Sequence, residues 1–91
     1  MKNVLIIGGT SVTPREKMNI EALLLRQMGY DVTVHFTAQD SDEIETQKKW
    51  LDENGIASYG EISDQIDWER LGKELKTHQN IIVKTNSMIL P

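Results

Sequence analysis

The sequence contains no cysteine and has only two prolines and one phenylalanine among its 91 residues. Without cysteine there is no disulfide framework, no thiolate zinc site and no thiol nucleophile. The apolar runs are far shorter than the roughly 20 residues of a membrane-spanning helix, and we expect no signal peptide before the first of them. Basic residues are also outnumbered, with 10 Lys and Arg against 14 Asp and Glu, whereas a nucleic-acid-binding surface carries excess positive charge. These absences predict a cytoplasmic protein that binds neither nucleic acid nor a membrane.

What the sequence does contain is a regular alternation of two apolar periods. Short β-branched runs are typical of buried strands, and apolar residues at every third or fourth position are typical of helices. The pattern predicts strands over residues 3–9, 30–37, 56–60 and 80–85, and helices over 15–29, 41–55 and 67–78. Strands that alternate with helices pair in parallel through right-handed crossovers. We therefore expect a single Rossmann-like α/β domain over residues 1–91: a three-layer half-Rossmann fold with four parallel strands in the order 3-2-1-4 and three helices.

The segment VLIIGGTSVTPRE, residues 4–16, joins the first predicted strand to the first predicted helix. Thr13 and Glu16 have the spacing of a capping box, and Pro14 suits the first position of a helix. Free amides of this helix would face the carboxyl edge of the sheet, where a phosphate would meet the positive end of the helix dipole. The candidate ligand-binding residues here are Gly8, Gly9, Thr10, Ser11, Val12, Thr13 and Arg15.

The same loop also fits a purely structural helix start. Glu16 uses some of the amides that a phosphate would need, and its carboxylate repels an anion. Val12 and Pro14 stand where the dinucleotide-binding fingerprint has glycines. The pattern therefore leaves two readings open, a bound anion and a helix start that only caps itself.

A second polar segment follows the last predicted strand. It consists of Lys84, Thr85, Asn86 and Ser87. Because open α/β sheets bind ligands outside the carboxyl ends of their strands, we expect a second ligand contact there. The last strand itself has no later strand to pair with, which predicts contact with another domain or with a second copy of the chain.

Several short motifs resemble the N-terminal domain of the D-glutamate-adding Mur ligase of peptidoglycan biosynthesis. They are KNVLIIG (2–8), ALLLRQMGYDVTV (22–34), LDENGIASYGE (51–61) and NIIVKTNSMILP (80–91). The resemblance implies a UDP-binding domain whose diphosphate contacts residues 9–13. It also implies that the uracil lies near His35, Phe36 and Thr37 and beside residues 84–87. The chain departs from the family at Phe36, which replaces an acidic residue, and at Asn86-Ser87, which replaces a Pro-Gly pair.

The ATP-binding Gly-Lys-Thr loop of that family belongs to its next domain, and no such motif occurs in this sequence. The resemblance therefore implies a nucleotide-sugar-binding domain that is not catalytic alone, either the first domain of a larger ligase or a stand-alone relative.

The GGTS turn and the strand around VHF also resemble the first half of a short-chain dehydrogenase. That resemblance implies NADP as the ligand. Arg15 and Thr37, with no acidic residue at the end of the second strand, would favour the 2′-phosphorylated form. The Ser-Tyr-Lys catalytic set of that family would lie beyond residue 91.

We expect neither catalytic residues nor a metal site in these residues. No Ser, His and carboxylate follow the order of a known triad, and the acidic run 40–45 has the spacing of a helix N-terminus rather than of ligands that converge on one ion. His35, in a strand beside apolar neighbours, also fits a structural role. Three functions stay open: binding of a UDP-type nucleotide, binding of NADP, and a non-catalytic module that docks through its last strand.

Overall fold

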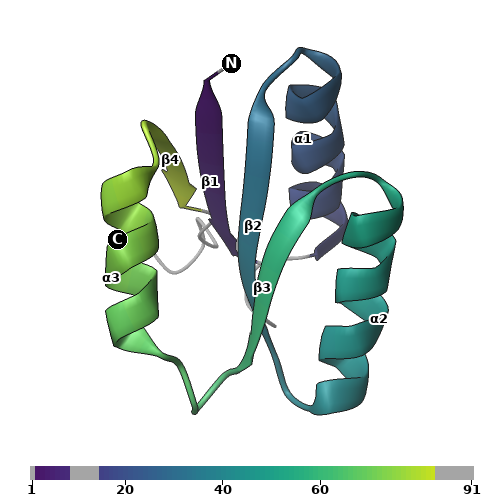
Figure 1. Ribbon diagram of the computed structural model, residues 1–91. Helices are drawn as coiled ribbons and strands as arrows, with labels where there is room; N and C mark the ends of the chain where they lie inside the picture. Colours follow the sequence, from purple (N-terminus) through teal and green to yellow (C-terminus); the bar gives the residue numbers. More distant parts are fainter. Residues whose placement is uncertain (1, 9–14, 84–91) are drawn as a thin grey trace, which may run out of the picture.

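The computed structural model describes residues 2–8 and 15–83 of the chain, which form seven elements (Figure 1). The strands are β1 (Asn3–Gly8), β2 (Asp31–Ala38), β3 (Ala57–Ile62) and β4 (Asn80–Val83). The helices are α1 (Arg15–Gln27), α2 (Ser41–Glu53) and α3 (Trp68–Thr77). Every element predicted from the apolar periods is present within a few residues of its expected bounds.

The four strands form one parallel sheet in the order β3-β2-β1-β4. This confirms the predicted half-Rossmann arrangement. In Figure 1, α1 and α2 lie on one side of the sheet and α3 lies on the other, so the fold has three layers. In the sheet, Ile7 of β1 stands opposite His35 of β2 on one side and Val83 of β4 on the other.

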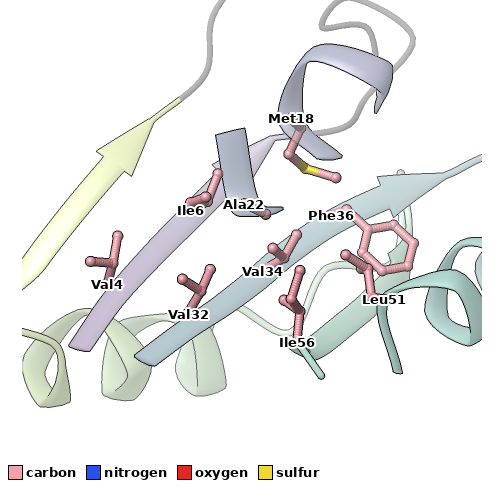
Figure 2. Packing of buried hydrophobic residues seen from close by; sticks show 9 residues of the cluster. All are labelled: Val4, Ile6, Met18, Ala22, Val32, Val34, Phe36, Leu51 and Ile56. Atoms are coloured by element: carbon pink, nitrogen blue, oxygen red, sulfur yellow. The ribbon is translucent and has the colours of Figure 1, made fainter. Parts of the chain in front are cut away.

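The main core lies between the sheet and the helices α1 and α2 (Figure 2). Its buried members are Val4, Ile6, Met18, Ala22, Val32, Val34, Phe36, Leu51 and Ile56. Burying a side chain of this size contributes about 1.5–3 kcal/mol relative to leaving it exposed. The apolar residues of the strands therefore pack against the apolar faces of α1 and α2 in one layer.

Two helix ends depend on glycine. Gly29 follows α1 with φ 95° and Gly55 follows α2 with φ 72°, in the left-handed region that favours glycine over residues with a side chain. The amide of Gly55 donates to the carbonyl of Asp52 at 3.1 Å. The predicted stop at Gly55 is confirmed, and the chain can turn directly from α2 into β3.

The acidic run after β2 caps a helix. Asp40 is the N-cap of α2, and its side chain accepts a hydrogen bond from the amide of Glu43 at 2.9 Å. Asp67 does the same for α3, accepting from the amide of Arg70 at 3.0 Å. Each bond satisfies one of the amides that a helix leaves free at its start.

Helix α3 differs from the sequence pattern in how it packs. The spacing of Trp68, Leu71 and Leu75 predicts an apolar face against the sheet, yet no residue of α3 is buried and Trp68 is 70% exposed. Trp68 is the first residue of the helix. This helix therefore gains much less apolar burial than α1 or α2.

Candidate functional site

The strand order creates a topological switch point between β1 and β4. The chain leaves β1 toward β2 and β3 on one side, and it returns through α3 to β4 on the other side of β1. In open α/β sheets, ligands bind in the crevice outside the carboxyl ends of the strands at this point. The fold thus has a switch point at the carboxyl edge of the sheet, the edge where the sequence analysis predicts the candidate site.

The two predicted binding segments leave the sheet from neighbouring strands. Gly8, the last residue of β1, is buried, and α1 starts at Arg15. On the neighbouring strand β4, Val83 pairs with Ile7. Residues 9–14 and 84–87 lie outside the described residues, and so does the predicted capping box at Thr13. The described strand ends nevertheless show that both segments begin at one edge of the sheet and on adjacent strands.

The predicted uracil contacts on β2 are all buried. Phe36 is 0% exposed and belongs to the core under α1 and α2 (Figure 2). His35 and Thr37 are also buried. They point to the opposite face, because side chains alternate along a strand. Phe36 lies two residues before the end of β2 and is paired with Gly8 on one side and Gly60 on the other, so its ring is not available to a ligand at the end of the strand.

His35 is hydrogen-bonded to a carboxylate that the sequence analysis did not single out. Its Nε2–H donates to Oε1 of Glu61 on β3 at 2.5 Å. Oε2 of Glu61 accepts from the amide of Asp67 at 2.6 Å, and Nη2 of Arg70 lies 3.5 Å from Oε1. The guanidinium of Arg70 also stacks over the ring of Tyr59, 4.8 Å from its centroid. One buried carboxylate therefore gathers donors from β2 and α3.

Opposing effects act on the pKa of Glu61. Burial of the carboxylate raises its pKa, whereas the hydrogen bonds from the Asp67 amide and His35 and the positive charges of His35 and Arg70 lower it. The net result is a pKa below the ordinary value of 4.5. Glu61 is therefore ionised at neutral pH although it is only 8% exposed.

The other ring nitrogen of His35 is free of partners. Nδ1 is buried and has no hydrogen-bond partner in the described part of the chain. Because Nε2 is bonded to Glu61, Nδ1 is the ring nitrogen that this pair leaves over. A buried nitrogen without a partner calls for an explanation, and the described residues show only that Glu61 orients the ring through Nε2.

Sequence reasoning missed Glu61 because the pairing depends on register. His35 and Glu61 lie 26 positions apart, and only the alignment of β2 with β3, which sets Thr37 opposite Glu61, brings the two side chains together. The available signal was an ionisable residue directly after the strand predicted over 56–60, which in the structure extends to Ile62 and includes Glu61. Such a residue is rarely fully buried unless it is paired.

A shallow hollow of about 310 Å³ lies at the start of α2. Asp40, Asp42, Glu43, Thr46 and Gln47 line it. The carboxylates make it unsuitable for a phosphate. Among residues 2–8 and 15–83, no three His, Asp or Glu side chains are arranged to hold a metal ion.

None of the helices in the described ranges is long and apolar enough to cross a bilayer. Comparisons with protein-family models, with curated proteins and with solved structures found no match to this chain. The resemblances to the Mur ligase domain and to the short-chain dehydrogenases therefore stay predictions from the sequence, and the fold and the switch point are what the structure adds to them.

Proposed function

We propose that the chain binds a nucleotide of UDP type at the switch point between β1 and β4 and is not catalytic alone. The observation that carries the proposal is the strand order, which makes β1 and β4 neighbours with the crossovers running to opposite sides. The glycine loop after β1 and the polar turn after β4 start from these two strands. A diphosphate would meet the amides of residues 9–13, and a base would lie beside residues 84–87 and the end of β2.

Charge favours α1 over the other two helices as the place for the diphosphate. The first turns of α2 and α3 carry acidic side chains, and an aspartate already caps each of them. Helix α1 instead begins with the sequence Arg-Glu-Lys, in which the acidic Glu16 stands between the basic Arg15 and Lys17. An anion at a helix N-terminus gains from the macrodipole only where no carboxylate already occupies the amides.

Calorimetric titration of the full chain with UDP, UDP-N-acetylmuramoyl-L-alanine, NADPH and inorganic phosphate tests the proposal. We expect both uridine ligands to bind, and phosphate alone to bind more weakly because it lacks the base and sugar contacts. Saturation by NADPH without binding of UDP would favour the dehydrogenase-like ligand instead. Absence of binding by all four ligands at millimolar concentration would contradict the proposal.

The variant Arg15→Gln should weaken UDP binding. Removing one charge-assisted contact to phosphate costs about 1.5–3 kcal/mol, which corresponds to a dissociation constant roughly ten- to a hundredfold higher. Lys49→Gln is the matched control, since it changes the net charge equally at an exposed position in α2. Equal effects of the two substitutions would show that only the overall charge matters.

A second candidate function is docking through β4, which one observation favours. β4 lies at the edge of the sheet, with Ile81 43% and Val83 59% exposed. Next to it is a hollow of about 400 Å³ to which Leu25, Tyr30 and Ile82 contribute. Gln79 and Asn80 also line this hollow, and an uncharged edge strand beside it suits the addition of a strand from a partner.

Sedimentation analysis over a range of concentrations tests this second candidate with a second copy of the chain as the partner. We expect a concentration-dependent dimer that Ile81→Lys abolishes, because a charge on the edge strand opposes pairing. A monomer at all concentrations in the wild type would contradict self-association through β4.

A further inference from the structure

The two faces of the sheet hold their helices in different ways. α1 and α2 insert Met18, Ala22 and Leu51 into the core, and each of these side chains is 0% exposed. α3 inserts no fully buried residue, and its Trp68 is largely exposed. Apolar burial therefore accounts for the attachment of α1 and α2 but not for that of α3.

The layer beneath α3 is mostly polar. By the alternation of side chains along β1, β2 and β3, the buried residues on this face are Leu5, His35, Thr37 and Glu61. Only Leu5 is apolar. Ile7 and Tyr59 on the same face are half-buried, so the contact between α3 and the sheet combines partly buried apolar side chains with buried polar ones.

Glu61 joins the sheet to the start of α3, while at the other end of the helix Nδ2 of Asn3 on β1 donates to the carbonyl of Thr77 at 3.2 Å. Oε2 of Glu61 accepts from the main-chain amide of Asp67, the N-cap of α3, at 2.6 Å. Its Oε1 accepts from His35 at 2.5 Å and faces Arg70 of α3 at 3.5 Å. Hydrogen bonds to an ionised group are roughly twice as strong as those between neutral groups. Both oxygens of Glu61 accept hydrogen bonds. A proton added to either oxygen would point at the hydrogen of its donor, so an attractive contact would become a repulsive one.

We propose that α3 is held by a carboxylate latch, formed by Glu61 with the Asp67 amide and Arg70. Protonation of Glu61 opens it and releases α3, while the sheet with α1 and α2 stays folded. The device makes the position of one helix depend on pH. It is independent of the nucleotide proposed above.

The groups around the latch define the direction of the pH dependence. His35 faces Glu61 from β2, Arg70 and Asp67 face it from α3, and the ring of Tyr59 lies under Arg70 on the same strand. The folded-state pKa of Glu61 is lowered. Its carboxylate therefore contributes fully to the stability of the folded state at a pH above the ordinary carboxyl range, and this stabilisation is lost as the pH falls through the folded-state pKa. The latch is therefore closed at neutral pH and opens in acid.

Glu61→Gln tests the latch at neutral pH, where the other carboxylates keep their charge. His35 and the Asp67 amide bond different oxygens of Glu61, and glutamine replaces one of these oxygens by an NH2 group, so one of the two donors would face another donor. Hydrogen exchange measured by NMR at pH 7 should show protection of the α3 amides reduced about tenfold or more, with α1 and α2 unchanged. Glu69→Gln, on the same helix at a side chain 85% exposed, should leave all three helices unchanged.

Two further measurements keep the proposal testable if Glu61→Gln does not fold. Arg70→Gln, at a side chain 41% exposed, should lower the protection of α3 by a smaller factor. In the wild type, the Cα shifts of α3 should move toward coil values between pH 7 and pH 3, before those of α2. Unchanged α3 protection in Glu61→Gln, or loss of all three helices together in Arg70→Gln and in acid, would overturn the latch.

Discussion

At the scale of single residues, two of the buried polar side chains, His35 and Glu61, pair with each other. Glu61 has donors from a neighbouring strand and from the helix above it, and the lowered pKa records that environment. On the other face of the same strand, Gly60 lies where β3 passes closest to the core. A Cβ at this position would lie 2.6 Å from Cζ of Phe36 and 2.7 Å from Cγ2 of Ile44. On β3, Glu61 thus places a charged side chain on one face of the sheet, and the neighbouring Gly60 has no side chain on the other face, where Phe36 and Ile44 pack against it.

Gly60→Ala should destabilise the protein. The added methyl group has to displace Phe36, which is fully buried and cannot move freely, and overpacking of this kind costs about 1–3 kcal/mol. Gly72→Ala is the matched control, because a Cβ there meets nothing within 4 Å. In the middle of α3 it should stabilise by about 0.5–1 kcal/mol. Urea denaturation measures both; equal free energies of unfolding for the two variants would contradict the packing at Gly60.

At the scale of elements, the two helix starts that lie wholly in the described residues follow one pattern. α2 and α3 begin at an aspartate that accepts a hydrogen bond from the third amide after it. The sequence predicts a different start for α1, with Thr13, Pro14 and a basic Arg15. Carboxylates therefore cap α2 and α3, whereas the sequence at the start of α1 has a basic residue, Arg15.

Asp40→Ala should shorten α2 from its start. Loss of an N-cap costs about 0.5–2 kcal/mol, and here the lost bond is the one to the amide of Glu43. Asp52→Ala provides the comparison, since Asp52 is exposed near the end of the same helix, where its charge opposes the dipole. Thermal unfolding should show a lower midpoint for Asp40→Ala only. A midpoint equal to that of the wild type would show that the cap contributes nothing.

At the scale of the whole molecule, the alternation of apolar periods was sufficient to predict the sheet. Strands of β-branched residues between amphipathic helices allow few topologies once crossovers must be right-handed, and the strand order and helix layers agree with the prediction. Periodicity does not specify register, which is why the pairing of His35 with Glu61 was not predicted. Nor does it specify how much of an amphipathic helix is covered, which is why Trp68 was expected to be less exposed than it is.

The site was predictable only as a location. β1 ends at Gly8 and α1 begins at Arg15. Because β4 is paired in parallel with β1, the end of β4 lies beside the end of β1. Ligand identity depends instead on side chains and amides in two short segments, where glycine spacing departs from known fingerprints. The choice between a UDP-type nucleotide and NADP is therefore an experimental one.

Mapping amide chemical shifts of the 15N-labelled chain during titration with UDP tests the switch-point site most directly. If UDP binds there, Gly8, Val83 and the amides of residues 9–15 and 84–87 shift strongly, while Asn3 and Asn80 at the opposite ends of β1 and β4 do not. Shifts confined to the amino ends of the strands or to α2, or no shifts at millimolar UDP, would contradict binding at the carboxyl edge of the sheet.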